Sequence, residues 1–200
     1  MSSLILSLVL FAILAIATGM LVLGGFWRAL VTFFNVLVAA SVATAWYETL
    51  ANFLERFLAD YTYLLDFLSI WLIFAVVVSL LRAATDWLSP NKVEFPKLVE
   101  WIGGGFTSFL TAWVLMAFTA ASLHTAPVPR DVIQPTPDAR MFLGLAPDRK
   151  WLAWVRNGSL SGPFSRGEKH VFDEQADFIL RYADRRLKLE QSEGLRVSAK

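Results

Sequence analysis

The sequence predicts an all-α membrane protein with four transmembrane helices and a C-terminal helical tail outside the membrane. Most apolar residues lie in the first 123 positions, where they form four blocks. Long stretches of this part, such as 1–27 and 29–47, contain no charged side chain. The hydrocarbon core of a bilayer is about 30 Å thick and needs about 20 apolar residues in a helix, a length that these blocks meet or approach.

The charged residues divide the chain into an apolar body and a charged tail. Residues 1–123 contain five Lys and Arg against seven Asp and Glu, and the rest contains thirteen against ten. Neither balance gives the clustered basic face of a nucleic-acid-binding protein, so no nucleic acid is expected as a partner. The expected partners are the lipid bilayer and either further copies of the chain or other membrane proteins. Because the chain has no cysteine, disulfides, thiolate metal sites and cysteine nucleophiles are excluded.

The first two spans are predicted at residues 4–24 and 28–47, separated by Gly24 and Gly25. The segment 48–60 that follows places its leucines and phenylalanines on one helical face and its charges elsewhere. This pattern is typical of a helix that lies along the membrane interface, or of one that extends the second span. The sequence leaves both possibilities open.

The third span is predicted at residues 63–82, with its uncharged core at 67–81. Asp66 lies in its first turn and Arg82 in its last, and each is at the favourable end of the helix dipole. Residues 89–97 contain two prolines and are typical of a loop. The fourth span begins near Trp101, and the run 103–105 of three glycines opens it.

Three regions follow from this pattern: a four-helix transmembrane region at 1–123, a proline-rich linker at 124–146 and a charged α-helical tail at 147–200. The prolines predict a linker that is not helical. In the tail, 147–156 predicts a short basic helix rich in tryptophan, which ends near Gly158. It either rests on lipid headgroups or forms a small core within the tail.

The main helix of the tail is predicted at residues 168–190. Ser165 and Glu168 have the spacing of a capping box at its start. Val171, Phe172, Phe178, Ile179 and Tyr182 share one face of this helix, while Asp177–Arg181 and Asp184–Lys188 are supporting pairs four residues apart.

The residues that usually carry chemistry are absent or wrongly spaced. The two histidines, His124 and His170, are 46 residues apart and have no carboxylate at metal-ligand spacing. The segment 158–162 has Leu160 where a nucleophile elbow has serine. The glycine run at 103–105 lacks the Lys and Ser or Thr of a phosphate-binding loop. We therefore predict no catalytic, cofactor-binding or metal-binding residue, and a protein that is not an enzyme.

Small and polar residues recur at helical spacing in the second and fourth spans. In lipid, such residues allow close backbone approach and bonds between helices. They predict that these two spans pack together, although the stripes would equally suit contact with a partner subunit. The residues assigned to helix packing are Thr32, Asn35, Ala39 and Ala43 in the second span and Gly104, Ser108 and Thr111 in the fourth.

Arg28 at the start of the second span is the ionisable residue with a possible role of its own. It can reach lipid phosphates as a headgroup anchor or line a substrate path. Asn35, near the middle of the span, is expected to hold helices together. A small transporter or channel, formed only as an oligomer, is the alternative to a non-enzymatic membrane component.

This layout resembles the colicin V production protein (CvpA) family over about residues 3–125. The likeness is carried by the uncharged first span, by Gly24-Gly25-Phe26-Trp27-Arg28 before an alanine-rich second span, and by Trp101-Ile102-Gly103-Gly104-Gly105-Phe106 at the fourth. The chain differs in having one arginine after the glycines, where two are common, and in its longer charged tail. The resemblance implies a bacterial inner-membrane protein with a role in toxin or bacteriocin production or secretion and in envelope homeostasis.

The loop charges give a small preference for one orientation. Four spans place both termini on the same side of the membrane. The side of the loops after spans one and three carries Arg28, Arg82, Lys92 and Lys97, and the opposite side carries Arg56, Arg130 and Arg140 close to the membrane. Because positive residues are enriched in cytoplasmic loops, this count favours termini outside the cytoplasm.

Overall fold

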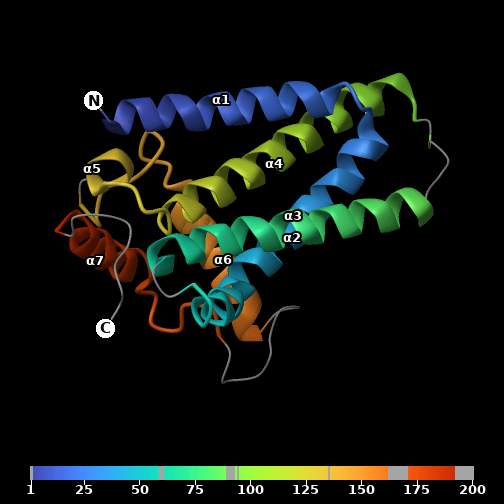
Figure 1. The fold of residues 1–200 in the computed structure, drawn as a ribbon. Coiled ribbons are helices and arrows are strands. Elements are labelled where there is room, and N and C mark those ends of the chain that lie inside the picture. The colour runs from blue at the N-terminus through green and yellow to red at the C-terminus, as the bar shows by residue number, and fades with distance from the viewer. Residues whose placement is uncertain are drawn as a thin grey trace.

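The computed structural model describes residues 2–58, 61–88, 93, 95–134, 136–161 and 171–191. Over these residues it is helical, without strands, which confirms the predicted all-α fold (Figure 1). The long helices are α1 (Ser2–Val22), α2 (Phe26–Glu55), α3 (Thr62–Leu88) and α4 (Lys97–Leu123). The shorter ones are α5 (Arg130–Ile133), α6 (Pro147–Ser161) and α7 (Phe178–Glu190).

The four long helices are each long and apolar enough to cross a membrane. Helix α2 has 30 residues, and at 1.5 Å per residue it is about 45 Å long, well beyond the thickness of the hydrocarbon core. The segment after the second span therefore extends that span as far as Glu55 and does not form a separate interfacial helix. Asp60, at its predicted end, lies outside the described residues.

The fourth helix starts four residues earlier than the predicted Trp101. It begins at Lys97, directly after Pro96, whose φ of −52° and ψ of 143° are outside the helical region. Proline before the first helical residue costs nothing, because the N–H that it lacks would have no partner there. The glycines at 103–105 thus lie within α4 rather than opening it, and Glu100 occupies its first turn.

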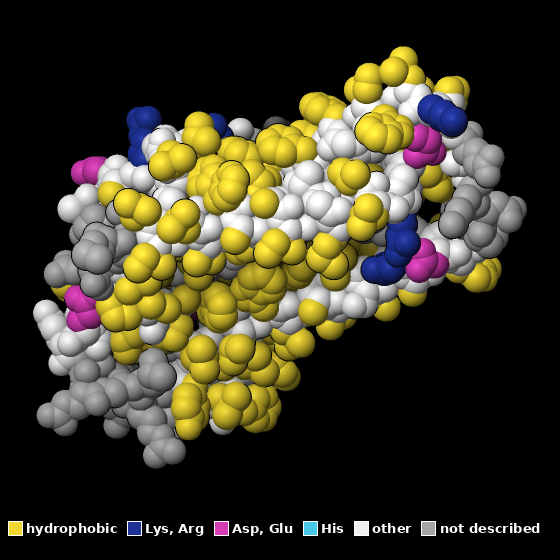
Figure 2. Space-filling model, turned by 90° about the horizontal axis from the view of Figure 1, so that it is seen from above, with side chains coloured by type: hydrophobic (Ala, Val, Ile, Leu, Met, Phe, Trp, Pro, Cys, Tyr) yellow, Lys and Arg dark blue, Asp and Glu magenta, His cyan; other side chains and the backbone are white. Residues whose placement is uncertain are grey.

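The long helices pack in the order α1, α4, α2, α3, and α3 crosses α2 in the view of Figure 1. Helix α4 packs against both α1 and α2, and α2 packs against both α4 and α3, so α1 and α3 lie at opposite edges. The α1–α2 and α3–α4 connections lie at one end of the long helices, α5 and α7 lie towards the other end, and α6 packs against α4 and α2. Figure 2 shows a broad hydrophobic surface over the long helices, with charged side chains gathered towards the two ends.

The proline-rich linker is more ordered than the sequence predicts. It contains the short helix α5, which begins directly after Pro129, so the expectation that this region is not helical is wrong for residues 130–133. The linker also packs against the membrane helices. One hydrophobic cluster joins its residues Ile133, Met141 and Phe142 to Leu6 and Leu10 of α1 and to Met116 and Ala120 of α4.

Both tail helices differ from their predicted limits. Helix α6 continues past Gly158 to Ser161, so this glycine does not end it. Helix α7 begins at Phe178 and not at residue 168, because Asp173 and Ala176 have φ values of +50° and +55° that interrupt a helix. Asp173 then accepts the N–H groups of Asp177 and Phe178 through its Oδ1 atom, at 2.9 and 3.0 Å. The predicted capping box lies at positions outside the described residues.

Candidate functional site at the tail-docking surface

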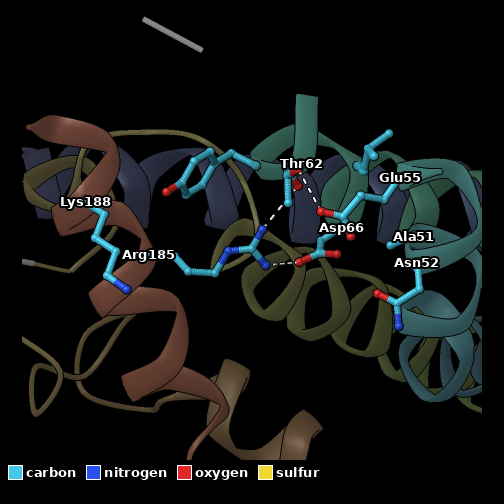
Figure 3. A pocket seen from close by; sticks show the side chains of 9 residues that line it. Ala51, Asn52, Glu55, Thr62, Asp66, Arg185 and Lys188 are labelled. Atoms are coloured by element: carbon cyan, nitrogen blue, oxygen red, sulfur yellow. Dashed lines mark hydrogen bonds and ion pairs between the residues drawn. The ribbon is translucent and has the colours of Figure 1, made fainter. Parts of the chain in front are cut away.

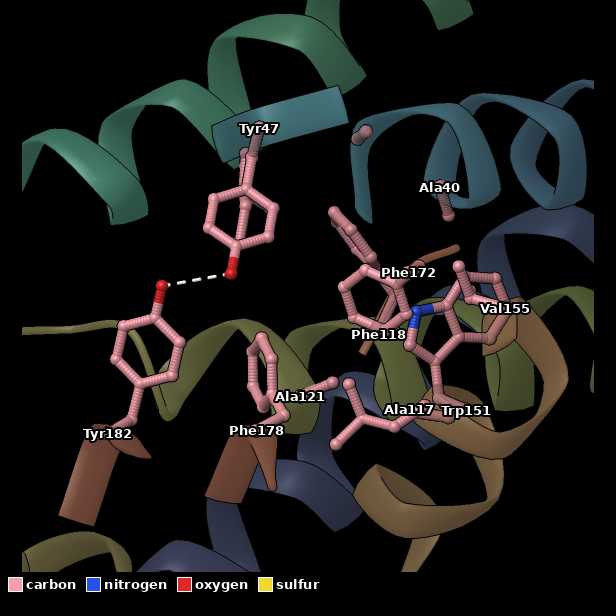
Figure 4. Packing of buried hydrophobic residues seen from close by; sticks show 13 residues of the cluster. Ala40, Tyr47, Ala117, Phe118, Ala121, Trp151, Val155, Phe172, Phe178 and Tyr182 are labelled. Carbon is pink, nitrogen blue, oxygen red and sulfur yellow. Dashed lines mark hydrogen bonds between the residues drawn. The ribbon is translucent and has the colours of Figure 1, made fainter. Parts of the chain in front are cut away.

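Helix α6 packs into the membrane helices instead of forming a core with the tail alone. Trp151, Leu152 and Val155 are buried in a cluster to which α2, α3 and α4 all contribute (Figure 4). The alanines of α2 and α4 provide the space that the large tail side chains fill. From the membrane helices the cluster contains Ala40, Ala43, Tyr47, Ile70, Ala117, Phe118 and Ala121, and the later part of the tail adds Phe172, Phe178 and Tyr182.

Two tryptophans of α6 also donate hydrogen bonds to α2. The indole N–H of Trp151 lies 3.0 Å from Thr44 Oγ1, and that of Trp154 lies 3.3 Å from Ser41 Oγ. Each of these hydroxyls in turn donates to the carbonyl four residues earlier in α2. The hydroxyls therefore act as both donors and acceptors, and they fix the position of α6 along α2.

Helix α7 is attached to α2 and α3 through a chain of polar side chains. The Tyr182 hydroxyl donates to Asp66 Oδ2 at 2.7 Å, and its oxygen lies 2.9 Å from the hydroxyl of Tyr47. Because Tyr182 has a single proton, Tyr47 must donate either to Tyr182 or to Glu48 Oε1, 3.0 Å away. Burial, together with the charge of Asp66, raises the pKa of Tyr182 well above its ordinary value, so this hydroxyl keeps its proton.

Two arginines of α7 complete this attachment. Arg185 forms an ion pair with Asp66 and donates to the carbonyl of Thr62 at 3.2 Å (Figure 3). Arg181 pairs with Glu48 at 3.0 Å, where both side chains are about half exposed. A pocket of about 290 Å³ lies beside Arg185, lined by Ala51, Asn52, Glu55, Thr62, Tyr63, Leu65, Asp66 and Lys188.

A histidine and an aspartate are paired in the interior at the C-terminal end of α4. His124 Nε2 lies 3.0 Å from Asp148 Oδ2, and both side chains are fully buried. Arg186 donates to the carbonyl of His124 at 2.6 Å. Burial lowers the pKa of His124, although the neighbouring Asp148 acts in the opposite direction. The lowered pKa favours the neutral imidazole at pH 7.

The glycines that carry the family resemblance meet at the other end of the long helices. Gly25 has a φ of +80°, which turns the chain between α1 and α2. The N–H of Phe26 donates to Glu100 Oε2 at 2.8 Å, so α4 supplies the cap for α2. A Cβ atom on Gly103 would lie 2.9 Å from the Phe26 ring, and one on Gly104 would lie 3.4 Å from the Phe26 nitrogen. At Gly103 a Cβ would require the Phe26 ring to shift, whereas at Gly104 it would just touch the backbone of α2.

The residues assigned to helix packing in the second span face different neighbours. Ala39 and Ala43 are fully buried, whereas Thr32 is partly exposed and donates to its own helix at the carbonyl of Arg28. Asn35 Nδ2 donates to Thr85 Oγ1 of α3 at 3.1 Å, so its amide bonds to the third span and not to the fourth. Arg28 itself is exposed at the start of α2.

In the fourth span, the assigned residues are all buried. Gly104 lies against the start of α2, as described above, and Thr111 donates to the carbonyl of Thr107 within α4. Ser108 Oγ has no hydrogen-bond partner among the described residues. Within the part of the chain that the structure describes, no group of three or more His, Asp or Glu side chains could hold a metal ion; His170 lies outside that part.

The sequence did not reveal the partners of Asp66 and His124. The sequence places Asp66 only in the first turn of the third span, and it shows His124 only as a histidine without a carboxylate at metal-ligand spacing. Their partners are 119 and 24 residues further along the chain. The one feature of the sequence that bears on these partners is the apolar face formed by Phe178 and Tyr182, which indicates the side of α7 that packs inward. No local spacing indicates which membrane helix that face meets.

Comparison with known proteins gives one match. The family model described as Colicin V production protein matches residues 6–166. No curated protein matches the chain, and no solved structure matches it. The matched range is longer than the resemblance in the sequence, because it continues past α4 through α5 and α6. The docked helix α6 is thus inside the family region, and the chain is a membrane protein that belongs to the Colicin V production protein family.

Proposed function

We propose that this protein is a non-enzymatic component of the bacterial inner membrane that supports the production or secretion of a toxin or bacteriocin and helps to maintain the envelope. In this proposal the chain crosses the membrane four times, and both termini lie outside the cytoplasm. The family description, which names colicin V production, supports the role. The full burial of His124 and Asp148, which leaves no room for a substrate to reach them, supports the absence of a catalytic step at this pair.

The apolar surface that α1 and α3 leave exposed carries this proposal. Only 11% of the apolar window of α1 and 22% of that of α3 is buried within the chain, against 56% for α4. The edge helices therefore offer long apolar faces to lipid or to further helices. Because α1 and α3 lie at opposite edges, one copy does not enclose a pore between its four helices. A component that assembles with itself or with other membrane proteins fits this arrangement best.

A bacteriocin-release assay tests the proposed role. In a producing strain that lacks its own member of the family, expression of this chain should restore release of the bacteriocin. Gly104→Leu, which disturbs the α2–α4 contact, should fail to restore it, whereas Gly105→Leu should succeed, because a Cβ at Gly105 has no neighbour within 4 Å. Equal release with and without the intact chain would contradict the proposal.

The alternative is a small transporter or channel formed by several copies. The pair Asn35–Thr85, a polar contact within the membrane-spanning part of α2 and α3, is the observation that favours it. Purified protein in liposomes separates the two functions. An assembly component gives no solute flux above that of protein-free vesicles. Asn35→Leu and Thr85→Val both remove the bond between these residues, but only the first removes the amide. Flux that is lost in Asn35→Leu and kept in Thr85→Val would therefore favour transport.

A further inference from the structure

A second pocket, of about 250 Å³, lies between the start of α1 and the segment that joins α4 to α6. Leu4, Leu6 and Ser7 line it from α1, and Gln134, Arg140 and Leu143 are among the residues that line it from the other side. It is separate from the tail-docking pocket beside Arg185, since the two share no lining residue.

The loop at one wall of this pocket has an unusual backbone. Phe142, Leu143 and Gly144 have φ values of +51°, +55° and +85°. For the two non-glycine residues this left-handed conformation costs about 1–2 kcal/mol each, so the surrounding packing must hold it. The turn places Phe142 inside, with its ring 6.4 Å from that of Trp113, and leaves Leu143 85% exposed.

The pocket is continuous with the surface of α1 that faces lipid. Leu4, which lines it, is 64% exposed; the adjacent Ile5 is 61% exposed, and Leu8, one turn further along, is 60% exposed. On a membrane-spanning helix such leucines and isoleucines contact acyl chains. A lipid whose headgroup enters the pocket can therefore lay its chain along α1, and Leu143 would enter the interface beside it.

Two polar side chains in the wall lack the partners that a headgroup would supply. Gln134 is only 3% exposed; its Nε2 donates to the carbonyl of Ala139, and its Oε1 has no donor among the described residues. A buried acceptor without a donor is costly, so a donor from a bound molecule would stabilise it. Arg140 is exposed and forms no ion pair with a described residue, which leaves its guanidinium available for a phosphate.

We propose that this pocket binds the headgroup of one phospholipid from the adjoining leaflet. Arg140 binds the phosphate, and Gln134 Oε1 accepts a hydrogen bond from a hydroxyl or ammonium group of the headgroup. The acyl chain lies along Leu4, Ile5 and Leu8 of α1. Phosphatidylglycerol and phosphatidylethanolamine share this chemistry, since each has a phosphate and a donor.

Native mass spectrometry of the purified full chain, with either lipid added to the detergent, tests the proposal. The variants are Arg140→Ala and Gln134→Leu. Arg56→Ala is the matched control, because Arg56 is an exposed arginine at the same end of the long helices but lies outside the pocket. Circular dichroism confirms that each variant keeps its helix content.

The intact chain and Arg56→Ala should each retain one phospholipid. Arg140→Ala should retain it about tenfold more weakly, the usual effect of losing a hydrogen bond to a charged group. If Arg140→Ala retains both lipids more weakly, the result supports recognition of the phosphate. If it retains only phosphatidylglycerol more weakly, the result supports the site and shows that the net negative charge of the lipid matters. Equal retention by Arg140→Ala, Gln134→Leu and Arg56→Ala would overturn the proposal.

Discussion

Two arginines of α7 pair with carboxylates of the membrane helices. The two pairs are buried to different extents, so they should contribute differently to the docking of α7. The side chains of Arg185 and Asp66 are 28% and 11% exposed, whereas those of Arg181 and Glu48 are 42% and 50% exposed. An exposed pair contributes about 0–1 kcal/mol because water screens it. Removing one member of a largely buried pair leaves a charge without its partner, which costs more.

Arg185→Ala should therefore weaken the docking of α7 by about 2 kcal/mol, while Arg181→Ala should weaken it by less than about 1 kcal/mol. The two substitutions are matched, since both remove an arginine from the same helix and both arginines lie over the ring of Tyr182. Hydrogen exchange of the α7 amides measures the difference. A larger loss of protection in Arg181→Ala would show that the pair with Asp66 does not hold α7.

The buried pair of His124 and Asp148 makes docking depend on pH. The docked state lowers the pKa of His124 below its ordinary value of 6.5, mainly through burial, so the undocked state binds a proton more readily. The charged groups that face the imidazole are Asp148, Arg149 and Arg186, and the two arginines add to the lowering.

Docking should be strongest above pH 6.5 and should weaken as the pH falls from 6.5 towards the lowered pKa of His124. Hydrogen exchange of the α6 amides across this range measures it. His124→Gln keeps a donor for Asp148 but does not titrate, so this variant should lose the dependence. If the intact chain and His124→Gln show the same pH profile, the pH dependence belongs to another titratable group.

Helix α4 approaches the start of α2 closely through Gly103 and Gly104. Gly104→Leu should separate the two helices, because Gly104 is buried and its Cβ would already be in contact with the backbone nitrogen of Phe26, at 3.4 Å, before the rest of the leucine is placed. Overpacking of this kind costs about 1–3 kcal/mol. Thermal unfolding in detergent, followed by circular dichroism, should show a lower midpoint for Gly104→Leu than for Gly105→Leu. Equal midpoints would contradict this close contact.

The sequence predicts the four long helices because their length and lack of charge depend only on local composition. It predicts their ends less well, as α4 and α7 show. The start of α7 depends on the left-handed backbone at Asp173 and Ala176, which no periodic pattern indicates. The end of α6 was placed at Gly158, but tertiary contacts around Ser159 outweigh the low helix propensity of glycine, since Ser159 accepts the N–H of Phe172.

The candidate site was harder to predict than the helices. Small residues in the second and fourth spans indicate where helices approach, yet the amide of Asn35 bonds to α3 because that helix lies on its side of α2. The pairs Asp66–Arg185 and His124–Asp148 join residues far apart in the sequence. A single sequence does not show which residues far apart along the chain lie close in space, so it indicates no partner for Asp66 or His124.

At the scale of the whole molecule, the first question is orientation. The loop charges near the membrane favour termini outside the cytoplasm, and the docked tail lies at the same end as the start of α1 (Figure 1). Alkaline phosphatase fused to the C-terminus should therefore be active, and a green fluorescent protein fused there and exported in the unfolded state should be dark. The reverse pattern would place the tail-docking surface in the cytoplasm.

The docking of the tail helices onto the membrane helices is the central feature of this fold. Because the chain has no cysteine, the pair Thr44→Cys and Trp151→Cys can be joined within one chain by a short bifunctional thiol reagent in intact membranes. We expect efficient cross-linking of this pair, since the two side chains are in contact, and none between Gly19→Cys and Trp151→Cys, since a Cβ at Gly19 would have no neighbour within 4 Å. Failure of the first pair, with both cysteines shown to react singly, would mean that α6 does not dock on α2.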